Sequence, residues 1–181
     1  TDCTMGDGAG DALAVLDEVA EGPQILVGSS MGGWIALLLA RERPGRVAGL
    51  IGIAAAPDFT EDLIWNLFTD EQKAELREKG VLYMPTEYGD EDYAITLAMI
   101  EEGRDHLVLQ EPLAIDCPVR LLQGMADAGV PWQVSLTLAE KLTSEDVTVT
   151  LVKGGGHRMS GPEDIRWLCA TVDELCAGHK K

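Results

Sequence analysis

Apolar positions along the chain fall into short continuous runs that are separated by longer stretches with helical spacing. Apolar runs of this kind, bounded by glycine or proline, are typical of strands that are buried on both faces. They lie at residues 24–28 (QILVG), 46–57 (RVAGLIGIAAAP), 117–124 (CPVRLLQG) and 147–156 (VTVTLVKGGG).

The stretches between these runs repeat apolar residues every three or four positions, which predicts helices. Residues 11–20, with Leu13 and Leu16, form one of them, and residues 31–44 (MGGWIALLLARERP) are apolar nearly all round until Arg41. A helix that is apolar on all sides is buried, so the segment 31–44 should be central. Strands that alternate with helices indicate an α/β fold, in which a parallel sheet is covered by helices on both faces.

Two further helices are predicted near the C-terminal end, and their spacing indicates which residues face the sheet. In the helix over 131–142, the residues that should face the sheet are Trp132, Leu136, Ala139 and Leu142. The helix over 160–178 should be capped by Ser160 and Glu163. Its inward residues should be Ile165, Leu168, Cys169, Val172 and Cys176.

The alternation is interrupted over residues 58–116, where the chain becomes more acidic. Thr69 and Gln72 fit a capping box at the start of one helix in this region. The helical segments predicted there are 58–68, 69–80 and 91–109. We interpret 58–116 as a helical cap insertion into an α/β core that is formed by residues 1–57 and 117–181.

Composition narrows the possible partners. The 181 residues suit one domain, and 31 acidic against 14 basic residues give a formal net charge of −17. Such a charge argues against nucleic acid or an anionic membrane as a partner. The four cysteines form no C-x-x-C pair or Cys/His metal cluster. We interpret them as reduced, mostly buried thiols, and with no apolar run of transmembrane length and no signal peptide we expect a cytoplasmic protein.

Candidate chemistry appears where the predicted strands end. In a parallel sheet, the carboxyl ends of neighbouring strands meet at one edge, where ligands bind. Ser30 follows the first strand, Asp127 the third and His157 the fourth. Serine, aspartate and histidine can form a catalytic triad, in which the histidine takes the serine proton and the aspartate orients the imidazole.

The serine lies in the pattern Gly28-x-Ser30-x-Gly32, between a strand and a helix. This pattern is typical of a nucleophile elbow, a tight turn that exposes the serine at a helix N-terminus. We expect that the residues two positions before and after Ser30 must lack bulk. The N–H group of Met31 could donate to an oxyanion. A phosphate-binding loop is not indicated, because no lysine follows these glycines.

Each residue also has a simpler interpretation. Asp127 could be a helix N-cap ahead of Pro131, and His157 could be an ordinary loop histidine. The order Ser, Asp, His at the ends of three strands favours the triad. His106 lies in the insertion and His179 lies in the tail, so neither is placed to act as the base.

These residues resemble the α/β-hydrolase superfamily. The stretches VGSSMGGWIALLLA, LLQGMADAGVPW and VKGGGHRMS look most like small bacterial carboxylesterase-type hydrolases. They are also similar to mitochondrial relatives that cleave acyl glucuronides and protein-bound palmitoyl thioesters. The resemblance implies Ser30 as nucleophile, Asp127 as acid, His157 as base and residues 58–116 as a cap over the acyl pocket.

One departure from the superfamily concerns the start of the chain. An α/β-hydrolase has several strands before its elbow, and a loop among them supplies the second oxyanion donor. Here only residues 1–23 precede the elbow strand. We therefore expect residues 24–28 to form an open sheet edge, which could pair in a homodimer, and we expect a half-built oxyanion hole. The chain could be a fragment, a short homologue or one subunit of a completed sheet.

The leading hypothesis is a serine hydrolase, a carboxylesterase or thioesterase, that acts on small acyl esters or thioesters and implies no metal or organic cofactor. An acyl pocket could be lined by Leu63, Ile64, Leu67 and Phe68, which could equally form the core of the cap. Two other hypotheses stay open. The chain could be a non-catalytic interaction protein with a relic triad, or an acyltransferase on the same scaffold.

Overall fold

The computed structural model describes residues 4–85 and 92–179 of the chain. Contacts divide it into two compact units. The larger unit contains Ala9–Pro57 and Val108–Lys181, and the smaller contains Thr1–Gly8 and Asp58–Leu107. The smaller unit thus ends at Leu107, whereas the insertion predicted from the sequence extended to residue 116.

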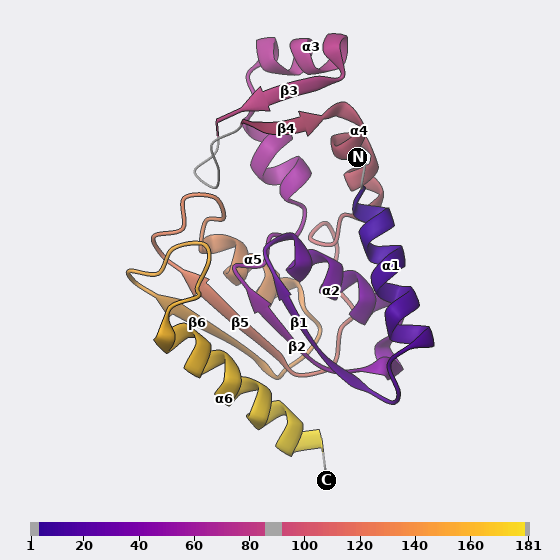
Figure 1. Ribbon diagram of the computed structural model, residues 1–181, viewed down its shortest axis with the longest axis vertical. Coiled ribbons are helices and arrows are strands. Elements are labelled where there is room, and N and C mark those ends of the chain that lie inside the picture. Colours follow the sequence, from indigo (N-terminus) through magenta and orange to yellow (C-terminus); the bar gives the residue numbers. More distant parts are fainter. Residues whose placement is uncertain (1–3, 86–91, 180–181) are drawn as a thin grey trace. The chain divides into compact units, whose positions relative to one another are not determined.

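The larger unit is built on a parallel four-stranded sheet in the order β1-β2-β5-β6 (Figure 1). The strands are β1 (Gln24–Ser29), β2 (Val47–Ile53), β5 (Val119–Gly124) and β6 (Val147–Val152). This arrangement confirms the predicted parallel sheet. Within the described part of the chain, β1 pairs only with β2, so β1 is an edge strand as expected.

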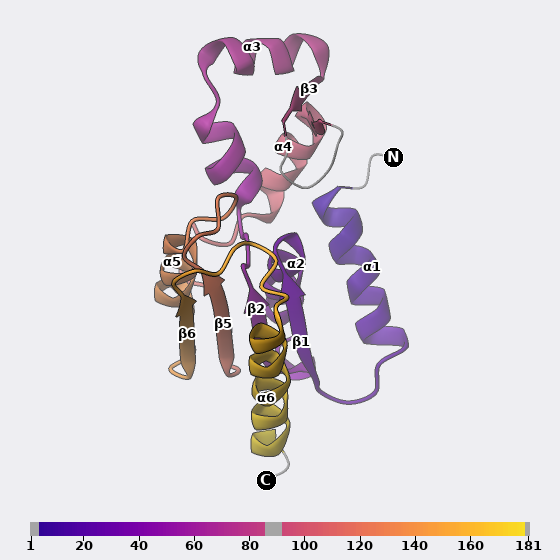
Figure 2. The ribbon, with the colours of Figure 1, turned by 60° about the vertical axis from the view of Figure 1, so that its left-hand side comes forward.

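Helices cover both faces of this sheet. They are α2 (Met31–Glu42), α5 (Gln133–Lys141) and α6 (Pro162–His179). Helix α1 (Met5–Glu18) precedes β1, and a 3-10 turn at Pro44–Arg46 precedes β2. Figure 2 shows α6 against one face of the sheet and α2 and α5 against the other. Helix α2 is central as predicted, because seven of its residues, Trp34 and Leu37 among them, are buried.

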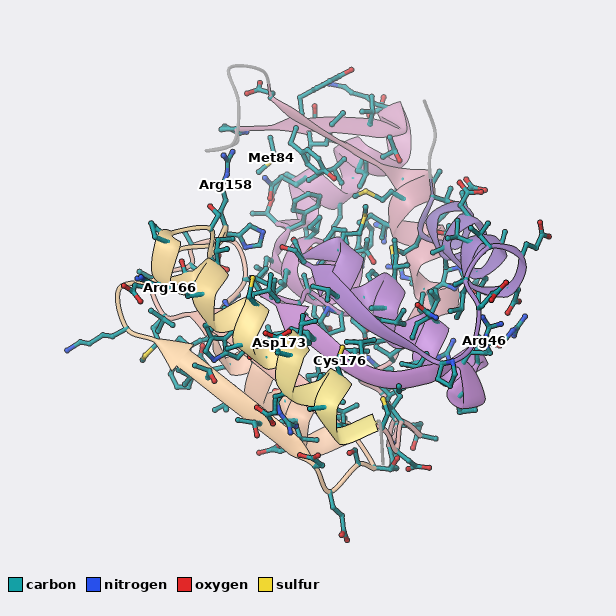
Figure 3. All side chains as sticks on the ribbon, turned by 60° about the horizontal axis from the view of Figure 1, so that its bottom comes forward. Arg46, Met84, Arg158, Arg166, Asp173 and Cys176 are labelled. Atoms are coloured by element: carbon teal, nitrogen blue, oxygen red, sulfur yellow. The ribbon has the colours of Figure 1, made fainter. Side chains whose placement is uncertain are left out.

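The side of helix α6 that faces the sheet was predicted in part. Leu168 and Val172 pack as expected against a buried cluster that contains Leu175, and Trp167 packs there as well. Ile165, Cys169 and Cys176 are exposed instead, and Figure 3 labels Cys176 on this helix. The pattern left out Thr171 because it is polar, yet its hydroxyl donates to the Trp167 carbonyl at 2.9 Å and so can be buried.

The cysteine interpretation changes accordingly. Cys169 and Cys176 are exposed free thiols, and only Cys117 of the described cysteines is partly buried. Burial raises the pKa of the Cys117 thiol.

The predicted cap of α6 is also wrong. The helix begins at Pro162. The side chain that accepts a hydrogen bond from a backbone amide before the helix, that of Gly161, is Asp164 rather than Glu163.

The prediction for helix α5 was right in part. Leu142, directly after the helix, is buried as expected, whereas Leu136 is 38% exposed, and Ser135 and Leu138 are buried. Ser135 tolerates burial because its hydroxyl donates to Gln123 at 3.2 Å. A pattern based on apolar residues alone could not include this serine.

Helix α1 begins at Met5, earlier than residue 11, and ends at Glu18. Its C-terminal end is stabilised by Arg46, labelled in Figure 3. The guanidinium of Arg46 donates to the carbonyls of Ala20 at 2.6 Å and Gly22 at 3.2 Å. Cations near a helix C-terminus satisfy carbonyls that have no partner within the helix.

The smaller unit contains a two-stranded antiparallel sheet that was not predicted. It pairs β3 (Val81–Met84) with β4 (Tyr93–Thr96) and adds α3 (Asp70–Lys79) and α4 (Leu97–Gly103). The helix predicted over 91–109 is therefore partly a strand, because the β-favouring residues Tyr93, Ile95 and Thr96 pair with β3. The segment 58–68 forms a π-helical turn and a 3-10 turn instead of one α-helix.

Two local features hold the smaller unit together. The capping box at α3 is confirmed, since the Thr69 hydroxyl accepts from the Gln72 amide and the Gln72 side chain accepts from the Thr69 amide. Leu76 and Ile100 are fully buried in its apolar cluster.

No helix in the described part of the chain is both long enough and apolar enough to cross a membrane.

Candidate active site

The elbow between β1 and α2 holds Ser30 in a backbone conformation that residues other than glycine rarely adopt, with φ 53° and ψ −121°. Backbone hydrogen bonds fix this turn against the end of β2. The Ser30 amide donates to Ile53 at 2.9 Å, and the Ser30 carbonyl accepts from Ala56 at 3.1 Å and from Gly33 at 2.9 Å. Such strain persists only where surrounding contacts determine it, and it clusters at functional sites.

Glycines around the elbow are required at positions 28 and 33. A Cβ atom at Gly28 would overlap the Gly32 carbonyl and lie 2.7 Å from the Gly33 Cα. At Gly33, it would lie 2.6 Å from the Ala55 Cβ. At Gly32, it would meet nothing within 4 Å among the described residues. The expectation that both glycines of the motif must lack bulk is therefore correct for Gly28 and wrong for Gly32.

The loop after β5 holds the carboxylate of Asp127, whose side chain is 0% exposed. Its Oδ1 accepts from the amides of Gly129 and Val130, both at 2.9 Å. Its Oδ2 accepts from the Gln123 side chain at 3.1 Å. The alternative role of Asp127 as a helix cap is not observed, because α5 begins at Gln133 with no side-chain cap.

The loop after β6 carries His157 and lies directly against the Asp127 loop. The Ala126 amide donates to the Gly155 carbonyl at 2.9 Å. A Cβ atom at Gly124 would overlap the Gly155 carbonyl and lie 2.6 Å from the Gly156 carbonyl. Glycine at 124 thus allows the two loop backbones to approach closely, which brings the carboxylate and the imidazole together.

The structure brings together the three side chains that the sequence singled out. His157 Nδ1 lies 2.8 Å from Asp127 Oδ2, and His157 Nε2 lies 3.0 Å from Ser30 Oγ. Both distances are those of hydrogen bonds. The His157 side chain is 18% exposed, so its ring stands between a buried carboxylate and a partly accessible hydroxyl. All three residues belong to the larger unit.

The carboxylate of Asp127 is ionised at neutral pH. Burial by itself raises its pKa, but the hydrogen bonds from Val130, His157 and Gly129 together outweigh burial and leave the pKa below its usual value. A buried carboxylate that accepts several N–H bonds is stabilised in the charged form. It can therefore stabilise positive charge on His157.

This lowered pKa predicts a pH-dependent contribution to stability. A depressed pKa stabilises the folded state above the unfolded pKa, near pH 4, and this stabilisation is lost as pH falls through the folded pKa. We therefore expect the difference in free energy of unfolding between the wild type and Asp127→Asn to be largest at neutral pH. Urea unfolding at pH 7 and pH 3 measures it. An equal difference at both pH values would contradict the lowered pKa.

The other predicted site residues are the oxyanion donor Met31 and the four residues predicted to line an acyl pocket. Met31 is the first residue of α2, so its N–H belongs to the first turn, whose amides have no partner within the helix. Of the predicted acyl-pocket residues, Ile64 and Phe68 pack against the apolar cluster of the smaller unit, and Leu67 is 71% exposed. Leu63 is partly buried. Their role in a pocket stays a prediction.

Sequence reasoning missed Gln123, which is fully buried and bonded to Asp127. A polar residue directly after two apolar strand residues, Leu121 and Leu122, and four positions before a candidate carboxylate, was the available signal. Among residues 4–85 and 92–179, no three His, Cys, Asp or Glu side chains gather in a way that could hold a metal ion.

Comparison with known proteins decides the family. A family model described as "Alpha/beta hydrolase family" matches residues 2–167. The chain belongs to the alpha/beta hydrolase family. Mouse palmitoyl-protein thioesterase ABHD10, mitochondrial, is 47% identical over 175 residues, which cover 96% of this chain and 59% of the mouse protein. This alpha/beta hydrolase therefore spans about three fifths of that relative's length.

Solved structures agree with this assignment. The structure of mouse alpha/beta hydrolase domain-containing protein 10 has a TM-score of 0.91 and 44% identity, covering 98% of this chain and 71% of that chain. A protein from Agrobacterium vitis S4 also has a TM-score of 0.91 and 44% identity, covering 95% and 68%. A monoacylglycerol lipase from Paleococcus ferrophilus, 19% identical with a TM-score of 0.72, shares the fold.

The comparisons overturn one expectation from the sequence. The relatives from mouse, cattle and human are all named as mitochondrial proteins. The expected cytoplasmic location of this alpha/beta hydrolase is therefore wrong. The expectation rested only on the absence of a signal peptide and of an apolar run of transmembrane length, and such absences do not determine a compartment.

Proposed function

We propose that this alpha/beta hydrolase cleaves acyl esters or thioesters through an acyl-enzyme formed on Ser30. The observation that carries the proposal is the continuous line of contacts from Ser30 Oγ through the His157 ring to Asp127 Oδ2. The contacts join three loops that are far apart in the sequence, and each role in a triad has the residue type that it needs.

The first half-reaction forms the acyl-enzyme. With Nδ1–H donating to Asp127, Nε2 of His157 accepts the Ser30 proton while Oγ forms a bond to the acyl carbon. The carbonyl oxygen becomes negatively charged, and the Met31 N–H donates to it. When the intermediate collapses, the bond to the alcohol or thiol breaks, and His157 returns the proton to that leaving group.

The second half-reaction uses water. His157 removes a proton from a water molecule as its oxygen bonds to the acyl carbon. Collapse of this intermediate breaks the bond to Ser30 Oγ, which takes the proton from His157, and the carboxylic acid leaves. The enzyme thus returns to its starting state, and the reaction consumes one water for each ester or thioester.

The name of one relative supports an extension of the proposal to a substrate class. The mouse relative is named a palmitoyl-protein thioesterase, so we extend the proposal to thioesters of long-chain acids. This chain covers 59% of that protein, so the statement that it has the thioesterase activity named for the relative is part of the proposal. With one oxyanion donor rather than two, the rate would fall about 10²–10³-fold.

Intact mass after treatment with a fluorophosphonate tests the proposal, because the reagent labels only activated serines. We expect one adduct on the wild type and none on Ser30→Ala. Ser29→Ala is the matched control, since Ser29 is the exposed neighbour of Ser30, and it should label like the wild type. A folded wild-type protein without an adduct would contradict the proposal.

Two alternative functions predict different results. An acyltransferase would pass the acyl group to an added alcohol far more often than the alcohol-to-water ratio predicts. A non-catalytic interaction protein would keep its function in Ser30→Ala. Pairing of the open β1 edge in a homodimer also stays a prediction, which light scattering at micromolar concentration can test.

A further inference from the structure

Gln123 is a buried polar side chain whose amide nitrogen donates to the loop that carries Asp127. It is 0% exposed at the end of β5, where the preceding strand residues Leu121 and Leu122 are apolar. Its Nε2 donates to Asp127 Oδ2 at 3.1 Å, to the Val130 carbonyl at 3.1 Å and to the Gly124 carbonyl at 3.3 Å. These bonds join the two ends of the loop that carries Asp127.

The other end of the amide is anchored as well. Gln123 Oε1 accepts from the Ser135 hydroxyl at 3.2 Å, and Ser135 is itself 1% exposed on α5. The loop determines the orientation of the amide, because the Asp127 carboxylate and the Val130 carbonyl only accept hydrogen bonds and therefore require its NH2 end. With the oxygen directed to α5, the nitrogen faces the carboxylate, and a donor rather than an acceptor meets Asp127.

Asp127 Oδ2 consequently accepts two bonds, one from Gln123 Nε2 and one from His157 Nδ1 at 2.8 Å. Oδ1 is held by the backbone amides of Gly129 and Val130. Among the described residues these bonds come from four groups, and the Gln123 amide and the two backbone amides are neutral donors. Gln123 therefore competes with His157 for the negative charge on the same oxygen.

We propose that Gln123 is a positioning residue, which fixes the Asp127 carboxylate and limits how strongly it attracts the proton of His157. This inference rests on the proposed triad and deepens it. Without the amide, the carboxylate would turn more freely and would be a stronger acceptor, so the imidazolium would be more stable. The base would then be protonated, and inactive, over a wider acidic range.

The test substitutes Gln123→Met, which keeps the length of the side chain and removes both polar atoms. We expect kcat to fall about tenfold with KM unchanged, because Gln123 is buried and acts through Asp127. The acidic limb of the kcat/KM profile should move to higher pH by about 0.5 unit. Gln110→Met, the same change at an exposed position, should match the wild type.

A double-mutant cycle separates positioning from general damage. In an Asp127→Asn background, Gln123→Met should have little further effect on kcat. An equal tenfold loss in both backgrounds would overturn the inference, as would an unchanged pH profile. Rates are divided by the number of serines that a fluorophosphonate titrates, so that a smaller folded fraction does not count as slower catalysis.

Two outcomes remain to be distinguished. If Gln123→Met does not fold, Ser135→Ala removes only the hydrogen bond that anchors the amide oxygen, and it should shift the acidic limb in the same direction by a smaller amount. No shift in that variant would overturn the inference. If the wild type is not labelled by the fluorophosphonate, the proposed function itself is contradicted. If the wild type is labelled and the Gln123 variants have the kcat and pH profile of the wild type, only this inference is contradicted.

Discussion

Replacing His157 by alanine is expected to lower kcat about 10⁴–10⁶-fold, the largest effect that we predict for activity. The hydroxyl of Ser30 would then lose its only imidazole partner among the described residues, 3.0 Å away. A neutral serine is a weak nucleophile, so acylation would stop almost completely. Steady-state hydrolysis of p-nitrophenyl acetate measures the loss, and KM should change little.

His106→Gln is the matched control for this substitution. His106 belongs to the smaller unit and contacts Glu102 at 2.7 Å, a contact that glutamine can also make. Its kcat should stay within about twofold of the wild type, because that imidazole has no role in the proposed reaction. A fall of comparable size in both variants, or full activity of His157→Ala, would contradict the assignment of the base.

Gly28→Ala is expected to give the largest loss of stability, lowering the free energy of unfolding by about 3 kcal/mol. The added methyl group would overlap the Gly32 carbonyl and lie 2.7 Å from the Gly33 Cα. Both atoms belong to the backbone, which cannot rotate away as a side chain can. The turn would have to open, and Ser30 would move away from His157. Urea unfolding and fluorophosphonate labelling measure the two consequences.

Gly32→Ala provides the comparison inside the same motif. Its new methyl group would meet nothing within 4 Å among the described residues, and position 32 lies in the first turn of α2. Alanine favours helix over glycine, so stability should be unchanged or higher by about 0.5 kcal/mol. Equal destabilisation of both variants would show that conformational freedom, rather than space, explains the glycines of the elbow.

Much of the fold could be predicted from short-range pattern. The β1 and α2 segments were predicted correctly because their apolar runs are continuous and are bounded by turn residues. The sides of α5 and α6 that face the sheet were predicted only in part, because Ser135 and Thr171 are buried with their hydroxyls bonded. The hairpin of β3 and β4 was missed because its strands have four residues each.

The sequence by itself determined the residue types at the site and the order of the strand ends that carry them. Tertiary structure decided their distances, because these depend on how closely separate loops approach. The small size of Gly124 and Gly155 allows the two loops to approach closely. Gln123 stabilises the loop after β5 through its hydrogen bond to Asp127. Such contacts join positions far apart in the chain, and no local periodicity encodes them.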